Sequence, residues 1–459
     1  MEYPKLKTLV CLLIVFAQFQ SVKGAEPREN QIQETSDFYC YNGTYKTEDG
    51  SVYLIGPSDK PNLRYRQPDG KTGKLFPQGN GIYISGEGWS NKENPIIEMH
   101  FGPCGDPTIK IIKDGQTQTG QKIPFPVEKI NFQSGENTLY GELFFPVGKS
   151  PEAVVVLQYG SGTMSAVDNN FMPYLLPLED IAVFVFDKQG TGKSEGTFTA
   201  DFETLAVDLV AAVEKIKLVF QDRNIPIGVL GESQGGWVTP LAATKTPVDF
   251  VIASYGLAVS PAEENRLEVF QKLEQGNFDK EVFEQAEEVI AATNVILKSK
   301  FTEGFDQLAA VKQKYGHHPW YIELDGDYTG PLANASEEEM KELKVLFNFD
   351  IDLFYDPVPV LYEVNVPMLW VLAEKDTEAP FKETFEIVKK LQDDGSKTDI
   401  AVFPDSEHGM ILVRDGENGV ELMGRYAEGY FELMIDWIKT LTFTRNYGES
   451  KLYVNKALE

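Results

Sequence analysis

The chain has 459 residues, of which 42% are hydrophobic, an ordinary fraction for a globular protein, and its length can hold two or three domains. Its 70 acidic and 42 basic residues give a formal net charge of −28 at pH 7. This excess of negative charge argues against nucleic acid and anionic membrane surfaces as partners.

Residues 1–24 have the pattern of a secretory signal peptide. Lys5 and Lys7 provide a basic start, and residues 9–19 form an apolar run that is too short to span a bilayer. Small residues at the end of the stretch offer a cleavage site, although an uncleaved anchor is the alternative. We therefore expect a secreted or periplasmic protein without stable membrane insertion, in which the polar residues 25–37 form a flexible lead-in.

Residues 38–114 predict a small all-β domain, because short aromatic and β-branched runs alternate there with turn residues. The expected strands are 39–45, 51–55, 63–66, 81–84, 96–101 and 108–113. Residues 114–121 are interpreted as a linker. Cys40 and Cys104 lie near the two ends of this domain, and an even pair of cysteines in an exported protein predicts one disulfide. Two buried free thiols are the alternative.

Residues 122–255 alternate between strand and helix patterns, which predicts a doubly wound, mostly parallel α/β sheet. The expected elements are a hairpin over 129–132 and 138–145, strands at 153–157 and 181–186, a helix over 201–220 capped by Asp201, and strands at 226–230 and 249–254.

The alternation stops at Gly256, and residues 256–350 are mostly Glu- and Lys-rich and compatible with helices. An insertion between two strands of such a sheet predicts a helical cap. The sheet is expected to resume within residues 351–441, with strands at 366–372 and 400–404 and a final amphipathic helix over 419–441. Residues 442–459 are left as a C-terminal tail.

The strongest chemical signal follows the strand expected at 226–230. Gly231-Glu232-Ser233-Gln234-Gly235 stands between that strand and a helix-compatible segment, and this order is the context of a nucleophile elbow. Glycines on both sides of the serine remove Cβ atoms that would clash in so tight a turn. Ser233 would then expose its Oγ, and the Gln234 N–H would face a developing oxyanion. Taken alone, the motif also fits an ordinary glycine-rich turn.

The partners that a nucleophilic serine needs follow in the order Asp, then His. Asp376 comes just after the strand at 366–372, and His408 comes just after the strand at 400–404. A histidine must remove the proton from the serine hydroxyl, and a carboxylate fixes the tautomer of that histidine. The chain has 4 histidines, so one at the expected loop is informative. Either flanking carboxylate, Glu374 or Glu407, could replace Asp376, which is better placed after its strand.

Further motifs accompany the elbow. Asp187-Lys188-Gln189-Gly190-Thr191-Gly192-Lys193-Ser194 follows the strand at 181–186, Leu157-Gln158-Tyr159-Gly160-Ser161-Gly162 follows the strand at 153–157, and Tyr355-Asp356-Pro357 precedes the strand at 366–372. With these motifs, residues 129–441 resemble the α/β-hydrolase superfamily, and more closely the exported esterases related to its serine aminopeptidase and dienelactone hydrolase branches. The chain has Gln189 where this family usually has arginine, and Tyr159 where it usually has histidine. The resemblance implies that the Ser161 N–H is the second oxyanion donor beside that of Gln234.

Neither a metal nor a cofactor is expected. His317-His318 lacks the helical spacing and the third ligand of a metal site, so we interpret it as an exposed loop. Gly192-Lys193-Ser194 is not a phosphate-binding loop, because that motif needs a glycine at position 187, which is aspartate. Asp325 and Asp327 are interpreted as turn residues and the acidic residues of the cap as a solvated face.

Together these patterns predict a serine hydrolase that cleaves an ester-type acyl bond of a small-molecule substrate through Ser233, His408 and Asp376, with the Ser161 and Gln234 N–H groups binding the oxyanion. An aminopeptidase or a thioesterase on the same scaffold is the alternative, and a peptidase would need a buried carboxylate in the cap to hold a substrate amine. A non-catalytic binding protein would usually have lost one of the three residues, and none is lost here. The sequence leaves the oligomeric state open.

Overall fold

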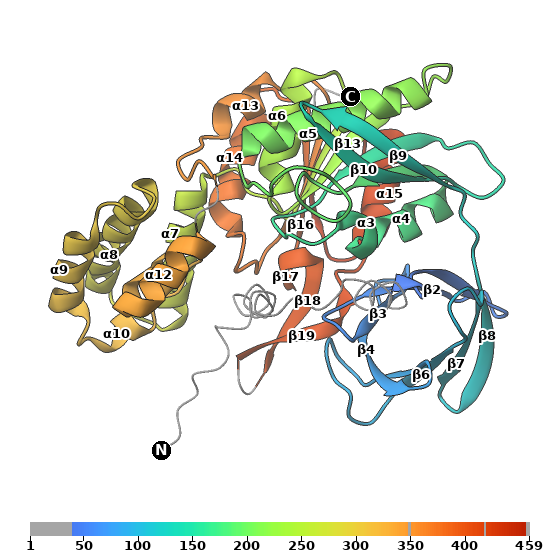
Figure 1. Cartoon of the computed structure of the whole chain (residues 1–459), viewed down its shortest axis with the longest axis horizontal. Helices are drawn as coiled ribbons and strands as arrows, with labels where there is room; N and C mark the ends of the chain where they lie inside the picture. Colours follow the sequence, from blue (N-terminus) through green and yellow to red (C-terminus); the bar gives the residue numbers. More distant parts are fainter. Residues whose placement is uncertain (1–38, 348–349, 417–418, 456–459) are drawn as a thin grey trace.

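The computed structural model describes residues 39–347, 350–416 and 419–455, so the predicted signal peptide and lead-in lie outside the described residues. Figure 1 shows a β-barrel, an α/β unit above it and a group of helices at one side of the α/β unit. The predicted fold class, a mostly parallel α/β sheet with a helical cap after a small all-β domain, is confirmed.

The N-terminal domain is a closed antiparallel barrel in which each strand pairs with the next and the last returns to the first. Its strands are β1 Gly43–Thr47, β2 Val52–Pro57, β3 Leu63–Arg66, β4 Thr72–Gly79, β5 Ile82–Ser85, β6 Ile97–Phe101, β7 Thr108–Lys113 and β8 Gln116–Lys122. Closure pairs every strand edge, and the interior is filled by tyrosine, phenylalanine and aliphatic side chains.

The barrel corrects the interpretation of residues 114–121 as a linker, because most of them belong to β8, which closes the barrel between β7 and β1. This strand carries no apolar side chain, and its buried residue is Gly120, where a Cβ would lie 2.9 Å from Ile109. Its pairing, and not an apolar pattern, therefore defines it. Strand β4 was also missed, since Gly73 and Pro77 both argue against a strand when the sequence is read alone.

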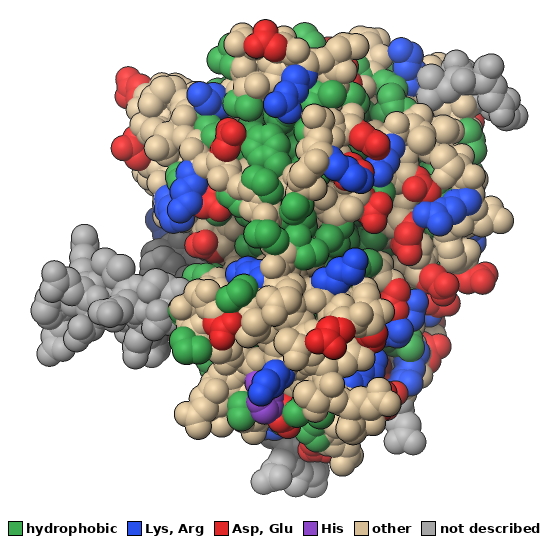
Figure 2. All heavy atoms as spheres, turned by 90° about the vertical axis from the view of Figure 1, so that its right-hand side faces the viewer, with side chains coloured by type: hydrophobic (Ala, Val, Ile, Leu, Met, Phe, Trp, Pro, Cys, Tyr) green, Lys and Arg blue, Asp and Glu red, His purple; other side chains and the backbone are tan. Residues whose placement is uncertain are grey.

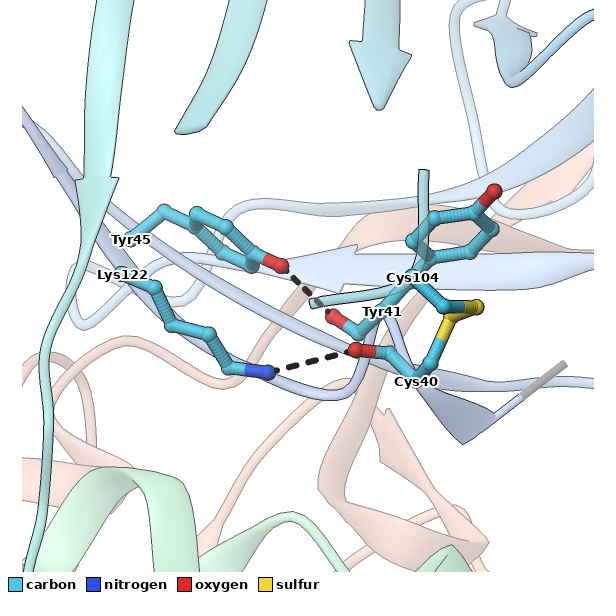
Figure 3. Close-up of a disulfide and its surroundings, with 5 residues drawn as sticks. All are labelled: Cys40, Tyr41, Tyr45, Cys104 and Lys122. Carbon is cyan, nitrogen blue, oxygen red and sulfur yellow. Dashed lines mark hydrogen bonds between the residues drawn. A yellow bond between two sulfur atoms is a disulfide. The ribbon is translucent and has the colours of Figure 1, made fainter. Parts of the chain in front are cut away.

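Cys40 and Cys104 are joined by the predicted disulfide, with their Cα atoms 5.5 Å apart (Figure 3). The bridge connects the segment before β1 to the loop between β6 and β7. Beside it, Lys122 Nζ donates to the Cys40 carbonyl at 3.3 Å, and the Tyr45 hydroxyl donates to the Tyr41 carbonyl at 3.1 Å. These bonds fix the chain that enters the barrel to its first and last strands.

The α/β unit is built on one sheet with the strand order β20-β16-β15-β14-β13-β11-β12-β10-β9. The strands are β9 Val127–Ser134, β10 Asn137–Phe144, β11 Ala153–Gln158, β12 Ile181–Phe186, β13 Ile227–Glu232, β14 Val251–Ser254, β15 Met368–Ala373, β16 Thr398–Phe403 and β20 Lys451–Tyr453. Strands β11 to β16 are parallel to one another, and the predicted hairpin of β9 and β10 and the edge strand β20 are antiparallel to their neighbours.

Helices cover both faces of this sheet, as the continuous apolar strands require. One face carries α5 Phe202–Val219, α6 Gly235–Lys245, α13 Val358–Glu363 and α14 Phe381–Asp393, and the other carries α3 Ala166–Asn169, α4 Met172–Leu175, η1 Leu176–Glu179 and α15 Tyr430–Thr440. Successive residues of β11 alternate between the two cores: Val154 and Val156 face the first, and Val155 and Leu157 face the second. Asp201 caps α5 as predicted, accepting from the Thr204 N–H.

The insertion after β14 is helical, as predicted. It consists of α7 Pro261–Gln275, α8 Lys280–Lys298, α9 Phe305–Tyr315, α10 Pro319–Ile322, α11 Thr329–Asn334 and α12 Glu337–Leu346. It has apolar clusters of its own, one around Ile296 and Leu332 and another around Val289 and Trp320. None of the helices in the described segments combines the length and the apolar character that a membrane span requires.

The end of the chain departs from prediction twice. The helix expected over 419–441 is instead a strand, β19 Gly419–Tyr426, followed by the shorter helix α15. The two are separated by Gly429, whose φ of +84° ends any helix that would run through it. The predicted tail also contains β20, which pairs with β16 and extends the sheet.

Strand β19 connects the two domains. With β17 Ser406–Glu407 and β18 Ile411–Gly416 it forms a small antiparallel sheet that begins just after β16. Arg425 pairs with Lys71 of the barrel, and the Tyr426 N–H donates to the Gly70 carbonyl at 2.9 Å. Figure 1 shows this sheet below the α/β unit and beside the barrel.

Charged groups are mixed on the face formed by the barrel and the β9–β10 side of the sheet. Figure 2 shows acidic and basic side chains interspersed there, with hydrophobic side chains gathered near the middle of the view. The net charge of −28 is therefore not expressed as a uniformly negative surface on this side.

Candidate active site

Ser233 lies in a strained turn between β13 and α6. Its φ is +53°, a left-handed conformation that a serine seldom adopts. The turn is tight enough to exclude side chains on both sides: a Cβ on Gly231 would lie 2.3 Å from the Gly235 carbonyl oxygen, and one on Gly236 would lie 2.8 Å from Gly256 Cα. The strand, turn and helix predicted from the motif are therefore present, with the strain that a nucleophile elbow carries.

The three predicted side chains form one hydrogen-bonded chain. His408 Nε2 lies 3.1 Å from Ser233 Oγ, and His408 Nδ1 lies 3.0 Å from Asp376 Oδ2. Asp376 is 2% exposed, and its Oδ1 also accepts from the N–H groups of Glu378 and Ala379 at 3.0 and 2.7 Å. Residues far apart in the sequence meet here because β13, β15 and β16 are parallel and end at the same edge of the sheet.

The two glutamates that could have replaced Asp376 are engaged elsewhere. Glu374 forms an ion pair with Lys451 of β20 at 2.7 Å. Glu407 accepts from the Thr377 N–H at 2.6 Å and from the His408 N–H at 3.1 Å, so it braces the loops around the histidine without touching the imidazole nitrogens. Of these three carboxylates, the one hydrogen-bonded to the ring of His408 is Asp376.

The two proposed oxyanion donors flank the serine. Gly160 packs against Ser233, since a Cβ on Gly160 would lie 3.5 Å from Ser233 Cβ, and the exposed Ser161 follows it. Gln234 is the residue before α6. In the part of the chain that the structure describes, neither the Ser161 nor the Gln234 N–H has a hydrogen-bond acceptor. Both N–H groups thus lack an acceptor within the described chain, as is required of donors that bind an oxyanion only during the reaction.

Tyr255 is a contact of His408 that the sequence did not reveal. It follows β14, has a φ of +41°, and its ring packs edge-on against the imidazole with centroids 5.0 Å apart. The Tyr255 N–H donates to the Val371 carbonyl at 2.8 Å, which fixes the residue to β15. No motif marks this position, because its role depends on which strand ends meet.

The electrostatic surroundings of His408 are strongly acidic. Desolvation alone would lower the pKa of His408, but the attraction of Asp376, followed by that of Glu378 and Glu407, outweighs it and raises the pKa from 6.5 to about 10. Glu378 Oε2 lies 3.7 Å from His408 Nε2, so this carboxylate stands beside the nitrogen that faces Ser233. The imidazolium form is therefore favoured when the site holds no substrate.

Acidic side chains of the cap lie in the same region. Glu264 and Glu268 lie one turn apart on α7, and burial, followed by the charge of Asp327, raises the pKa of both well above its usual value. Partial desolvation, followed by the charge of Glu378, raises the pKa of Asp327 to about 6, although this residue is exposed to solvent. The charge of His408 opposes the shifts of Glu264 and Asp327, so these groups lie near the imidazole.

Glu268, which is 9% exposed, departs from the predicted solvated face, whereas Asp327 is an exposed turn residue, as predicted. Glu268 Oε2 accepts from the Asp327 N–H at 2.8 Å, and Gln271 of the same helix donates to the Asp376 carbonyl at 3.1 Å. Helix α7 is thus tied to the loop that carries Asp376. The i, i+4 spacing of Glu264 and Glu268 was the available signal, since it puts both on one helix face.

The two rejected motifs have structural roles in the described chain. The Lys193 N–H donates to Asp187 Oδ2 at 2.9 Å and Ser194 Oγ donates to the Asp187 carbonyl at 2.6 Å, so the Gly-Lys-Ser turn wraps around its own aspartate. The rings of His317 and His318 lie 4.3 Å apart, and His318 stacks beside Trp320 of the cap.

The parallel sheet with an antiparallel hairpin at one edge, the elbow after β13 and the helices on both faces define the α/β-hydrolase fold, and the chain belongs to the α/β-hydrolase superfamily. Two families of serine hydrolases match within it. Residues 149–281 match the serine aminopeptidases of family S33, and residues 312–433 match the prolyl oligopeptidase family.

Similar proteins include lipases, esterases and peptidases. The chain is 26% identical to monoglyceride lipase of Rattus norvegicus over 157 residues, which is 33% of this chain and 50% of the lipase. It therefore spans about half the length of this relative. Solved structures include an esterase of Pyrococcus furiosus (15% identity, TM-score 0.39, 62% of this chain and 85% of that one) and an acylaminoacyl peptidase of Pyrococcus horikoshii (14%, TM-score 0.41, 84% and 56%).

Proposed function

We propose that the protein hydrolyses carboxylic esters, with Ser233 as nucleophile, His408 as general base and Asp376 as the group that orients the base. The observation that carries the proposal is the continuous hydrogen-bonded chain from Asp376 through His408 to Ser233. The match to a serine hydrolase family around the elbow and the sequence similarity to a lipase support the same class of reaction.

The geometry accounts for each step of an acyl transfer. His408 Nε2 accepts the Ser233 proton as the hydroxyl attacks the ester carbonyl, and Asp376 stabilises the imidazolium that forms. The N–H groups of Ser161 and Gln234 bind the oxyanion of the tetrahedral intermediate. The imidazolium then protonates the leaving alcohol, and water activated by His408 releases the acid from the acyl-enzyme. No metal or cofactor is needed for this sequence of steps.

Labelling by a fluorophosphonate probe and turnover of p-nitrophenyl esters test the proposal. Ser233→Ala should abolish labelling and lower turnover by about 10⁴- to 10⁶-fold, because the attacking atom is removed. Ser58→Ala, which changes a partly exposed serine just after β2 of the barrel, is the control and should leave both unchanged. Turnover retained in purified, folded Ser233→Ala protein would exclude this mechanism.

A second candidate function, hydrolysis of a substrate that carries a free amine, is favoured by the cap carboxylates. Glu264 and Asp327 lie near His408, and the buried Glu268 accepts from the Asp327 N–H, so together these groups would attract an ammonium group of the substrate. This arrangement supplies the buried carboxylate that an aminopeptidase needs. A panel of p-nitrophenyl esters, acyl-thioesters and aminoacyl p-nitroanilides, each amine compared with its N-acetyl form, separates the ester, thioester and aminopeptidase functions.

Substitution of a cap carboxylate tests directly whether the cap recognises the substrate amine. If the carboxylates hold an amine, Glu264→Gln should raise KM for the free-amine substrates and leave KM for the N-acetylated ones unchanged. Glu274→Gln, at an exposed position of the same helix, is the matched control. Equal effects of Glu264→Gln on free and acetylated substrates would exclude amine recognition and leave the ester function as proposed.

Export of the protein is also part of the proposal. The pattern of residues 1–24 and the disulfide between Cys40 and Cys104 support a secreted or periplasmic location. N-terminal sequencing of the protein recovered from its native source should find a chain that starts near Ala25. A mature chain that starts at Met1 would argue against cleavage.

A further inference from the structure

We propose that Lys188 is a positioning residue of the oxyanion hole: it holds the peptide group that carries the Ser161 N–H by binding the Gly160 carbonyl oxygen. This inference rests on the proposed function, because it assigns a role within that active site. The donor concerned is the Ser161 N–H. The family that the sequence resembles usually has a histidine two residues before this donor, where this chain has Tyr159.

The sheet brings Lys188 to the oxyanion loop. Strands β11 and β12 are parallel neighbours, with Leu157 opposite Val185. Gly160 and Lys188 each lie three residues beyond that pair, so they leave the sheet at the same level. Lys188 Nζ donates to the Gly160 carbonyl oxygen at 2.6 Å.

The geometry of the peptide group links the hydrogen bond between Lys188 and the Gly160 carbonyl to the active site. The carbonyl of Gly160 and the N–H of Ser161 belong to one planar trans peptide, in which they point in opposite directions. A cation that holds the oxygen therefore fixes the direction of the N–H and also polarises it, which makes it a stronger donor. The peptide stands beside the nucleophile, since Gly160 packs against Ser233 and the Glu232 carbonyl.

The surroundings of Lys188 do not provide another reason for a lysine. The residue is 2% exposed, and in the described part of the chain it forms no ion pair. Its ammonium lies 5.6 Å from the centre of the Phe198 ring. Burial lowers the pKa of Lys188 to about 7, so an uncompensated ammonium here is unfavourable for folding. An apolar side chain would fill the space with a lower desolvation cost, whereas only a hydrogen-bond donor can hold the carbonyl.

Three lysine variants test the inference with an ester substrate. Lys188→Met keeps the length of the side chain and removes the donor, and it should lower kcat/KM by about 10- to 10³-fold, mainly through kcat. Lys188→Gln is the second variant, which still allows the measurement if Lys188→Met does not fold. Lys193→Met is the matched control in the same turn, with a half-exposed side chain, and should retain wild-type kinetics.

Two inhibitors distinguish positioning from a general structural effect. A trifluoromethyl ketone forms a tetrahedral adduct that occupies the oxyanion hole, whereas the corresponding methyl ketone resembles the ground state. Loss of Lys188 should weaken the trifluoromethyl ketone in proportion to the fall in kcat/KM and leave the methyl ketone nearly unchanged. Equal weakening of both would show a structural role and overturn the inference.

A substitution of the donor itself completes the test. Ser161→Pro removes the N–H that Lys188 is proposed to hold. In that background Lys188→Met should have little further effect, because both changes remove the same interaction. Fully additive effects, or unchanged kinetics in Lys188→Met, would overturn the inference while the proposed function stands. A wild-type protein that neither labels nor turns over esters would overturn both.

Discussion

At the scale of the residue, the site depends on how firmly each carboxylate is held. Asp376 is fixed by two backbone N–H groups and faces His408 Nδ1, whereas Glu374 is directed away towards Lys451. A group held in this way can select one tautomer of the imidazole, the one that leaves Nε2 free to accept the serine proton.

Asp376→Asn should therefore lower kcat for an ester by about 10³- to 10⁴-fold, because an amide in this position favours the wrong tautomer. Glu374→Gln is the matched control, two residues away after the same strand, and should change kcat by less than about twofold. Steady-state kinetics with a p-nitrophenyl ester measure both. The opposite ranking would assign the acid to Glu374.

The acidic surroundings of His408 predict an unusual pH dependence. The imidazole must be neutral to accept a proton, and its pKa is raised to about 10, so kcat/KM should rise with pH well beyond neutrality. The free energy of unfolding depends on pH in the opposite direction. The imidazolium contributes stability that is fully present below about pH 6.5 and lost as pH rises through about 10. Measurement of kcat/KM for a p-nitrophenyl ester from pH 6 to 11 checks the predicted rise.

Glu378→Gln should move the rise in kcat/KM to lower pH, because it removes a negative charge 3.7 Å from His408 Nε2. Glu386→Gln, at an exposed position of α14, is the control and should leave the profile in place. A wild-type profile centred near pH 6.5, unmoved by Glu378→Gln, would show that the carboxylates do not act on the base.

At the scale of the element, the buried strands were predicted better than the exposed ones. The strands from β11 to β16 are buried throughout and mostly apolar, and each was predicted within a few residues. Strand β8 was missed because its side chains are polar, and β19 was taken for helix because its Glu, Leu and Met residues favour helices while Val420 and Leu422 remain exposed. Pairing with distant strands decides such elements, and a single sequence does not display pairing.

The candidate site was predictable to the extent that it lies at strand ends. Ser233, Asp376 and His408 each follow a recognisable buried strand, and the parallel topology brings such ends together. Glu264, Asp327 and Tyr255 were not predicted, since the cap helices and the loop after β14 acquire their orientation only from packing. Lys188 was part of a motif, but its contact with Gly160 depends on the register of two strands.

Gly429, between β19 and α15, gives a prediction at this scale. A Cβ there would lie 2.6 Å from the Tyr447 carbonyl carbon, and the φ of +84° is unfavourable for alanine. Gly395→Ala has a similar φ of +100° but no neighbour within 4 Å, so it measures the backbone effect alone, about 1 kcal/mol. Gly429→Ala should lower Tm clearly more than Gly395→Ala in thermal unfolding followed by circular dichroism, and equal shifts would contradict the packing described.

At the scale of the whole molecule, the barrel contacts the segment that follows His408. Arg66 of β3 donates to the Tyr426 hydroxyl at 2.9 Å and lies over the Phe171 ring, while Tyr426 and Arg425 pair with the turn before β4. The contact is made by β19, which is connected through β18 to His408. The barrel and the α/β unit therefore share an interface, although neither Cys40 nor Cys104 contributes to the site.

Replacing both cysteines with serine should destabilise the barrel with little effect on ester turnover at room temperature. Cross-linking residues 64 positions apart contributes about 4 kcal/mol in the chain-entropy model. Hydrogen exchange should show faster opening of β1 to β8, and the kinetics of both proteins can be compared directly. Intact-mass analysis after alkylation, with and without reductant, tests the bridge, and two alkylated thiols without reductant would exclude it.

Strand β20 has a consequence for how the protein is made. It pairs with β16, at the outer edge of the sheet, and it leaves the ribosome only after β19 and α15 have been synthesised. Until then β16 presents an open row of N–H and carbonyl groups to any other extended chain. Messages that stop before Lys451 would leave this edge permanently uncovered, so such products should be cleared by proteases or found in aggregates even though every residue of the proposed site is present.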